Sequence, residues 1–381
     1  MITAGLVALG FLLLSYISLM LLYEKGWRLQ PYFHVPEAFI PSTKITIVIP
    51  ARNEEATIGA CIASILECRY PDHLYEVIVV DDHSTDTTYD VVTSFEKKNV
   101  TCLRLRDFLK AGEVLNAYKK KAIETAVAQS SADIIVTTDA DCVVGKDWLS
   151  NIAAIYEQEK AVFIIGPVSY RVDNSVLSVF QSLDFLSMQG ITAAAHRLKL
   201  GNMSNGANLA FSRAAFEKVK GYEGIDHLAS GDDYLLLVKM QKEFPGKIVY
   251  LKAAESIVAT APQPDWQGFI NQRIRWASKM GKYDDKMITF ILALVYLFNF
   301  SFLLLAILGF FDFYFWILGG ALLLIKTVVE LFYLRNVAGF FNKSRELFYF
   351  PFLQPVHVAY IIVAGFLGLF GKYHWKGRKV K

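Results

Sequence analysis

Four long apolar stretches constrain the fold of this chain more than any other feature of its sequence. They occupy residues 2–23, 287–310, 313–334 and 348–370. A helix that crosses a bilayer needs about 20 mostly apolar residues, and each stretch is long enough. We therefore expect a transmembrane anchor at 1–24 and about three transmembrane helices within 287–370. A more polar domain lies between them.

The first stretch has the properties of a retained anchor and not those of a signal peptide. A signal peptide starts with basic residues and ends at a cleavage site of small residues. Here no basic residue precedes the apolar run, and the run ends on the bulky Tyr23. Lys25 and Arg28 follow it, and positive charge beside a span favours the cytoplasmic side. We expect an extended linker at 25–43 and a cytoplasmic domain after it.

Residues 44–262 have the pattern of an α/β domain, in which short apolar runs alternate with helical segments. The strand-like runs lie at 45–49, 76–80, 101–105 and 133–138, and the helical segments lie at 55–67, 86–98 and 118–129. This alternation predicts a mostly parallel sheet with right-handed crossovers. Ser84 or Thr85 is expected to cap the helix at 86–98. The amphipathic segment 177–200 fits two positions equally well, on the membrane surface or packed on the sheet.

Charge and composition exclude several classes of function. The formal net charge is only +3, and the central domain has no basic stripe interleaved with aromatic residues, so we expect no nucleic acid partner. The four cysteines have neither Cys-x-x-Cys nor zinc-finger spacing, so they are expected to be buried thiols. The seven histidines show no His-Glu-x-x-His pattern, and we assign no metal to them.

Asp139 and Asp141 directly follow the apolar run at 133–138. Side chains two residues apart in an extended chain point the same way, and open α/β sheets bind ligands at the carboxyl ends of their strands. Magnesium is commonly held by one or two carboxylates together with substrate phosphates. The pair therefore fits a metal-diphosphate site. It also fits an ordinary solvated turn, because Asp-x-Asp is a short pattern.

Three other motifs each have an ordinary explanation when taken alone. Asp81-Asp82 ends a strand-like run, Asp232-Asp233 lies near a turn, and Gln-x-x-Arg-Trp at 272–276 precedes an apolar stretch. Aspartates after a strand commonly form turns or helix caps, and Arg and Trp beside a span commonly anchor it at the interface. The joint order of the motifs is more specific than any one of them.

That order resembles the order in membrane-integrated family 2 glycosyltransferases, which have the GT-A fold. The resemblance covers roughly residues 45–276, and it implies a Rossmann-like α/β domain, with a mostly parallel sheet, flanked by transmembrane helices. Residues 48–54, which end on Glu54, look like the family's opening strand and loop. Residues 79–86, which contain Asp81 and Asp82, look like its nucleotide-binding stretch.

The remaining motifs of the resemblance follow in the family's order. Lys119 stands where the family often has a basic residue, and Asp139-Ala140-Asp141 looks like its Asp-x-Asp motif. Gln272, Arg275 and Trp276 match the Gln-x-x-Arg-Trp motif of polysaccharide synthases and ceramide glucosyltransferase-like enzymes. One departure is Asp232-Asp233, where the family usually has Glu-Asp.

The resemblance implies a role for each site residue. Asp141, with help from Asp139, would hold Mg2+ or Mn2+, and Asp82 would accept a hydrogen bond from the uracil of a UDP-sugar. Asp233 aligns with the family's catalytic carboxylate and is the expected base, with Asp232 as the second candidate.

Arg275 and Trp276 would bracket the diphosphate and the acceptor sugar. The substrate-binding set implied by the family also includes Glu54, Asp81, Lys119 and Gln272. The implied reaction is a direct displacement with inversion at the anomeric carbon. The donor is a nucleotide diphosphate sugar, with UDP favoured by the family over GDP.

Alternatives remain open for the whole protein. The acceptor is either a membrane lipid, which receives one sugar, or a growing polysaccharide that is exported. About four spans offer little material for a channel, which favours the lipid, although an oligomer or a partner subunit would supply a pore. A different class is a non-catalytic nucleotide-binding membrane protein, which would not need Asp233 or the motif at 272–276.

Two charged regions bear on the topology of the C-terminal part, 287–381. Lys326 and Glu330 are four residues apart and are expected to pair on one helix. The interfacial segment is expected at 263–286 and a basic tail at 371–381, and a short basic tail favours the cytoplasmic side. Three full spans would place it outside. Pro351 and Pro355 would allow a broken or re-entrant last segment, which would leave the basic tail on the cytoplasmic side. Three full spans remain the main expectation.

Overall fold

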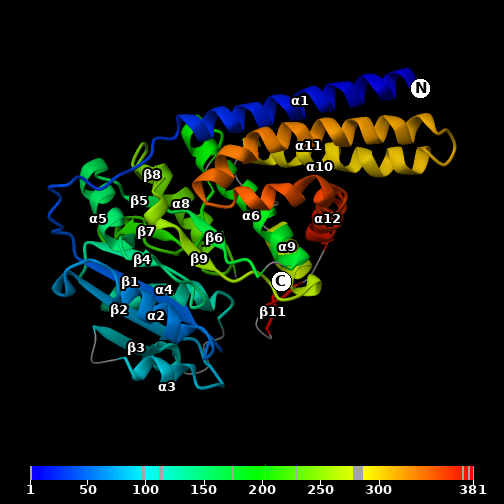
Figure 1. Cartoon of the computed structure of the whole chain (residues 1–381). Coiled ribbons are helices and arrows are strands. Elements are labelled where there is room, and N and C mark those ends of the chain that lie inside the picture. Colours follow the sequence, from blue (N-terminus) through cyan, green and yellow to red (C-terminus); the bar gives the residue numbers. More distant parts are fainter. Residues whose placement is uncertain are drawn as a thin grey trace. The chain divides into compact units, whose positions relative to one another are not determined.

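The computed structural model describes residues 2–95, 99–110, 115–173, 175–201, 203–228, 230–277, 286–370, 373–375 and 378–380. The chain divides into two compact units (Figure 1). The helical unit comprises Met1–Gln30, Tyr170–Gly201 and Pro262–Trp375, and the sheet unit comprises Pro31–Ser169, Asn202–Ala261 and Lys376–Lys381.

The sheet unit is built on a seven-stranded sheet with the order β3-β2-β1-β4-β7-β5-β8. Its strands are β1 (Ile45–Ala51), β2 (Tyr75–Asp81), β3 (Val100–Arg104), β4 (Ile134–Thr137), β5 (Phe163–Ile165), β7 (Leu209–Ser212) and β8 (Ile248–Tyr250). All neighbouring pairs are parallel except those of β7, which runs antiparallel to both β4 and β5. The apolar residues of β1, β2 and β4 are buried, as expected for strands covered on both faces. The predicted mostly parallel sheet is confirmed.

Helices connect these strands. They are α2 (Ile58–Leu66), α3 (Thr88–Thr93), α4 (Tyr118–Gln129), α5 (Trp148–Glu159), α7 (Arg213–Lys218) and α8 (Asp232–Glu243). Two further short strands are β6 (Val168–Tyr170) and β9 (Val258–Thr260). The helix predicted at 118–129 has the predicted bounds. Two short C-terminal strands are β10 (Tyr373–Trp375) and β11 (Arg378–Val380).

The prediction that Ser84 or Thr85 caps α3 is wrong, because the helix begins later and Thr87 is its N-cap residue. The backbone NH of Ser84 donates to Asp81, so this part of the chain is still turning away from β2. Asp86 Oδ1 accepts from the backbone NH and the hydroxyl of Thr88. The Asp86 carboxylate therefore accepts a hydrogen bond from an NH group in the first turn of α3. We had expected the hydroxyl of Ser84 or Thr85 to be the acceptor in this turn.

The helical unit contains α1 (Ile2–Leu29), α6 (Val176–Leu198), α9 (Trp266–Ala277), α10 (Lys286–Leu308), α11 (Tyr314–Phe340) and α12 (Phe350–Phe370). Four described segments are long and apolar enough to cross a membrane: Thr3–Leu29, Lys286–Leu308, Tyr314–Phe340 and Ser344–Gly368. α1, α10 and α11 lie against one another (Figure 1). α1 continues beyond position 24, where we expected the anchor to end.

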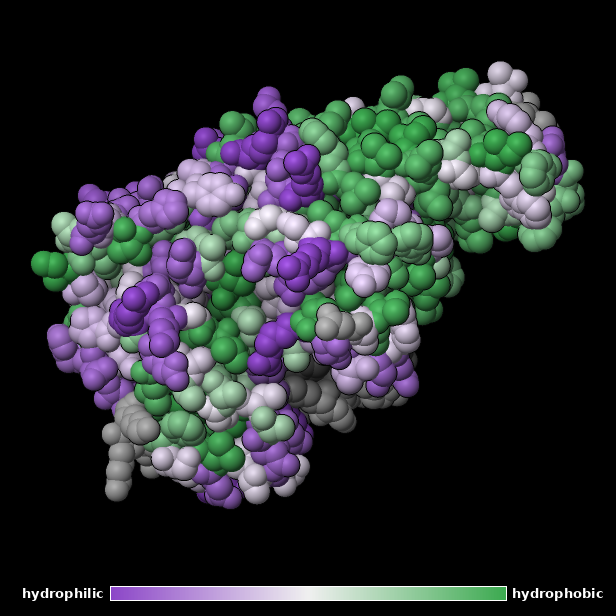
Figure 2. All heavy atoms as spheres, in the orientation of Figure 1, coloured by the Kyte–Doolittle hydropathy of each residue, from purple (hydrophilic) through white to green (hydrophobic). Residues whose placement is uncertain are grey.

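The face of α1, α10 and α11 that Figure 2 shows is mostly hydrophobic. Exposed large apolar side chains include Phe11 on α1, Phe290 on α10 and Leu324 on α11. An apolar surface of this kind is unfavourable in water and suits the hydrocarbon of a bilayer. The helices thus fit the membrane association that the apolar stretches predicted.

α6 belongs to the helical unit, although its sequence lies inside the segment 44–262 that we expected to form the glycosyltransferase domain. It packs closely on two of the apolar helices. A Cβ at Gly26 of α1 would lie 2.8 Å from the Ala194 carbonyl oxygen, and one at Gly190 would lie 2.3 Å from the Tyr333 hydroxyl of α11. Glycine at these positions allows close approach between α6 and its neighbours.

α12 is a continuous helix through Pro355. Pro351 lies in its first turn, where a missing backbone NH costs little. Pro355 removes one hydrogen bond from the helix without ending it. α12 therefore fits the expected full last span, without the break that the two prolines would have allowed. Of the basic tail, Lys372, Lys376 and Lys381 lie outside the described residues.

Candidate active site

The carboxyl ends of β1, β2 and β4 meet at one edge of the sheet, because these strands are adjacent and parallel. β2 ends on Asp81, and the Asp82 NH donates to the Ala51 carbonyl at the end of β1 (2.8 Å). Asp139 and Asp141 follow the end of β4. The fold thus places the strand-end aspartates at the edge where open α/β sheets bind ligands.

Asp82 is held in the loop after β2. Its side chain is 6% exposed and lies 2.9 Å from His83 Nδ1. Arg52, just after β1, donates to the Asp82 carbonyl (3.0 Å). The neighbouring Glu54 NH donates to Thr88 Oγ1 (2.7 Å). These contacts hold the loop after β1 against the residues that follow β2. Of the predicted nucleotide-binding residues, Asp81 ends β2, Asp82 follows it and Glu54 lies in the loop after β1.

Lys119 joins the Asp-x-Asp motif to α8. Its Nζ lies 2.7 Å from Asp139 Oδ1 and 3.4 Å from Asp232 Oδ2. Burial alone would lower the pKa of Lys119, but the charges of Asp139 and Asp232 outweigh it and raise the pKa above its usual value. A Cβ at Gly206 would lie 3.2 Å from both Lys119 Nζ and Asp232 Oδ2. The site thus brings together residues from α4, from the loop after β4 and from the first turn of α8.

Asp232 and Asp233 have different surroundings, although they are adjacent. Both lie in the first turn of α8, where the helix dipole favours carboxylates. Gly231, before them, has φ +81°, a left-handed conformation that glycine adopts without strain. Asp232 contacts Lys119, whereas Asp233 Oδ1 accepts from the Tyr234 backbone NH (2.7 Å).

Asp141 lies in a negatively charged environment. Its Oδ2 accepts from Thr260 Oγ1 (3.1 Å). Burial, followed by the nearby charges of Asp139 and Glu54, raises the pKa of Asp141 above its ordinary value. A carboxylate that is destabilised in this way would be stabilised by a cation.

The donor set fits a metal that is completed by substrate. In the described part of the chain, no group of three or more His, Cys, Asp or Glu side chains is arranged to hold an ion. Asp139 and Asp141 supply hard carboxylate oxygens, and magnesium usually takes one or two of these together with waters and substrate phosphates. The two aspartates therefore match a metal that binds with a diphosphate.

The Gln-x-x-Arg-Trp residues lie on α9 of the helical unit. Gln272 Oε1 accepts from the Tyr170 hydroxyl (3.3 Å). The Trp276 ring lies 6.1 Å from the ring of Phe185 on α6, centroid to centroid. Arg275 is half-buried. The helix holds Gln272 and Trp276 against other residues of the helical unit.

Sequence reasoning missed three residues of these surroundings. Thr260 and Gly206 carry no motif, and they reach the site only through β9 and through the loop before β7. Arg273 occupies a variable position of the five-residue motif. Its only sequence signal was a positive charge next to Gln272, and its partner lies on a different helix.

Family models match most of the chain. The model for glycosyl transferase family 2 matches residues 46–220, and the model for glycosyl transferase family group 2 matches residues 134–366. A mannosyltransferase of Pyrobaculum calidifontis, solved with GDP-Man and Mn2+, has a similar fold. It is 18% identical, the match covers 97% of this chain and 99% of that one, and the TM-score is 0.58.

Curated relatives include the probable glycosyltransferase YdaM of Bacillus subtilis, which is 29% identical over 71% of this chain and 65% of its own length. The poly-beta-1,6-N-acetyl-D-glucosamine synthase of Staphylococcus epidermidis is 24% identical over 61% of this chain and 53% of its own length. The beta-monoglucosyldiacylglycerol synthase of a Nostoc species is 29% identical over 33% of this chain and 25% of its own length. The chain thus spans less than two thirds of the length of these relatives. The second family model covers more than half of the chain, and the strand-end aspartates lie on a GT-A-like sheet, so the chain belongs to the family 2 glycosyltransferases.

Proposed function

We propose that this protein transfers a sugar from a nucleotide diphosphate donor, a UDP-sugar, to a membrane lipid, with inversion at the anomeric carbon. The observation that carries the proposal is the contact of Lys119 with both Asp139 and Asp232. This contact supports a single site in which the Asp-x-Asp carboxylates and the candidate base on α8 act on one substrate.

The donor occupies the carboxyl edge of the sheet in this proposal. Asp82 accepts a hydrogen bond from the uracil, with Asp81 at the end of β2 and Glu54 in the loop after β1. Asp139 and Asp141 hold the divalent metal, which when bound neutralises charge on the diphosphate leaving group. Lys119 adds a positive charge beside Asp139, at the site proposed for the diphosphate.

Asp233 acts as the general base. An acceptor hydroxyl is a poor nucleophile, and a carboxylate that takes its proton as it attacks makes the displacement faster. Asp232 is held by Lys119, which leaves Asp233 as the better candidate of the pair. Gln272, Arg275 and Trp276 contribute to binding of the diphosphate and the acceptor, since guanidinium suits phosphate and indole suits a sugar face.

The lipid acceptor is supported by the small number of candidate spans. The four such segments among the described residues provide little material for a polysaccharide channel. The relative named as a glycolipid synthase is consistent with this acceptor. The second candidate, extension of a polysaccharide, is favoured by the relative named as a poly-N-acetylglucosamine synthase, and it would call for an oligomer or a partner subunit.

Release of free nucleotide tests the enzymatic proposal against simple nucleotide binding. Purified protein in detergent is incubated with UDP-sugars and GDP-sugars, total membrane lipid and Mg2+ or Mn2+. We expect release of UDP that depends on both the lipid and the metal. Tight binding of donors without release under any of these conditions would identify a non-catalytic receptor.

The proposed topology places residues 44–283 in the cytoplasm, where nucleotide sugars are made available, with three C-terminal spans and the tail outside. The unbroken α12 supports a full last crossing. We therefore expect Lys381→Cys to react with a membrane-impermeant maleimide in intact cells, above the level of the unsubstituted chain. A substituted tail that reacts only after the cells are opened would show that the last segment does not cross.

A further inference from the structure

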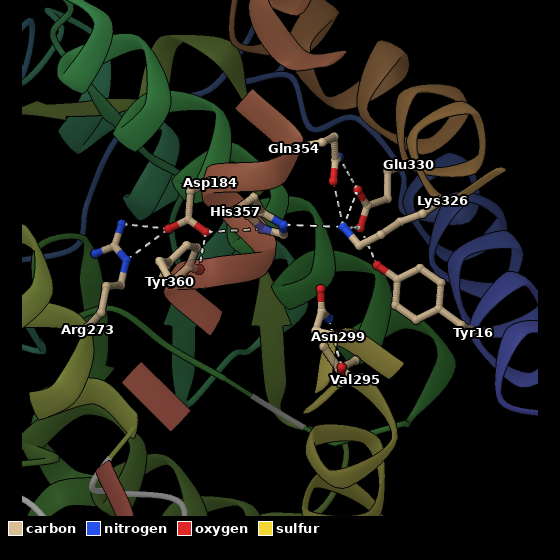
Figure 3. Close-up of polar contacts among 10 residues, drawn as sticks. All are labelled: Tyr16, Asp184, Arg273, Val295, Asn299, Lys326, Glu330, Gln354, His357 and Tyr360. Atoms are coloured by element: carbon tan, nitrogen blue, oxygen red, sulfur yellow. Dashed lines mark hydrogen bonds and ion pairs between the residues drawn. The ribbon is translucent and has the colours of Figure 1, made fainter. Parts of the chain in front are cut away.

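A buried polar network runs through the helical unit (Figure 3). It joins residues of α9, α6, α12, α11 and α1, namely Arg273, Asp184, Tyr360, His357, Gln354, Lys326, Glu330 and Tyr16. Charged side chains in an apolar environment are unfavourable unless they are paired, and those retained within membrane helices are commonly functional.

Asp184 and Arg273 form the part of the network nearest in sequence to the Gln-x-x-Arg-Trp motif. Both side chains are only 4% exposed, and Arg273 Nη2 lies 2.7 Å from Asp184 Oδ2. Arg273 Nε donates to the same oxygen (2.9 Å). The Tyr360 hydroxyl donates to Oδ1 of Asp184. Asp184 is therefore fixed by α12 and in turn fixes the guanidinium.

The guanidinium of Arg273 contacts two motif side chains. Its Nη1 donates to Gln272 Oε1 (2.6 Å). Its carbon lies 4.3 Å from the ring centroid of Trp276, within the range of a cation–π interaction. Because the Trp276 ring also packs near Phe185 on α6, the position of the guanidinium influences how Gln272 and Trp276 are held.

We infer that Asp184 is a positioning residue for glycosyl transfer, which orients Gln272 and Trp276 through Arg273. The inference rests on the proposed function, in which these two side chains act on the substrate. Removal of the negative charge from Asp184 releases the guanidinium from its fixed plane. The cation–π contact with Trp276 and the hydrogen bond to Gln272 then lose the geometry in which the guanidinium was held.

The other half of the network offers a matched control. Lys326 Nζ donates to both oxygens of Glu330 (2.9 Å each) and to Gln354 (2.8 Å). These residues lie on α11 and α12. Glu330→Gln also replaces a buried carboxylate of this network with an amide, as Asp184→Asn does. Its position differs, because Glu330 and the partners named above join α11 to α12 and do not include a residue of α9.

The experiment uses the full chain in detergent and has two readouts. The emission of Trp276 is isolated as the difference between each variant and the same variant with Trp276→Phe. We expect Asp184→Asn to shift this difference spectrum and to lower kcat by about 10²-fold, the size of effect that a small misplacement of substrate-positioning groups produces. Glu330→Gln is expected to leave the Trp276 spectrum as in the parent chain.

Arg273→Lys keeps the test decisive if Asp184→Asn fails to fold. Lysine retains the charge opposite Asp184 but lacks the planar fork, so the same spectral shift and loss of kcat are expected. An unchanged Trp276 spectrum in each folded variant, or an equal shift in Glu330→Gln, would overturn the inference. A spectral shift with normal kcat, together with normal kcat in Trp276→Phe, would instead refute the proposed role of the motif in transfer and leave the positioning of Trp276 by Asp184 in place.

Discussion

Substitution of Asp141 by asparagine is expected to abolish transfer, with a loss in kcat on the order of 10³-fold or more. Asp141 lies next to other carboxylates, and burial with the charges of Asp139 and Glu54 raises its pKa. Asparagine keeps the shape of the side chain and removes the charge that would hold a metal. Transfer is measured with saturating donor and acceptor, before and after removal of divalent ions by a chelator.

Two comparisons make the Asp141 result specific. The chelator should reduce the wild-type enzyme to the level of Asp141→Asn and should leave the variant unchanged. Thr260→Val serves as a control, because it removes the hydroxyl that donates to Asp141 and keeps the carboxylate, so a much smaller loss is expected. Full wild-type activity in excess chelator would refute the metal assignment.

Asp233→Asn is expected to lower kcat by about 10²–10⁴-fold, the contribution of a positioned general base, while donor binding persists. Asp232→Asn is the matched comparison on the same turn of α8. Because Asp232 contacts Lys119, its loss is expected to weaken donor binding more than the chemical step. Donor affinity is measured by calorimetry and kcat by product formation. Inactive Asp232→Asn beside active Asp233→Asn would reverse the two assignments.

The sheet and its catalytic edge were predictable because their signals are local. The apolar runs that became β1, β2 and β4 are short and bounded by polar residues. Asp82 and Asp139 follow the last residues of their strands. Parallel strand order then brings these ends to one edge without any further information.

Contacts between distant segments were harder to predict. The position of α6 was left open because amphipathicity shows that a helix has an apolar face and does not identify the surface that covers it. The contact of Lys119 with Asp232 depends on how α8 is placed beside α4. The pattern of apolar residues along the sequence does not predict that placement. Arg273 was overlooked because its significance comes from Asp184, on another helix.

The predicted cap of α3 is wrong for a different reason, and the break that the prolines would have allowed in the last helix is not formed. Ser84 is a good N-cap residue, but its hydroxyl accepts from the Asn53 NH and so supports the loop after β1. Proline commonly ends a helix, yet α12 continues through Pro355. In the helical unit α12 packs against α9 and α10. In both places tertiary contacts outweighed the local preference.

The mass of the lipid product tests the central claim most directly. Wild-type protein and Asp233→Asn are incubated with each UDP-sugar and total membrane lipid, and the organic phase is analysed by mass spectrometry. The proposed function predicts one new lipid species, heavier by a single sugar residue, which forms with one preferred donor and is lost or strongly reduced in Asp233→Asn. A ladder of products that each differ by one sugar, or sugar recovered only in a water-soluble polymer, would contradict single transfer to a lipid and identify a polysaccharide synthase.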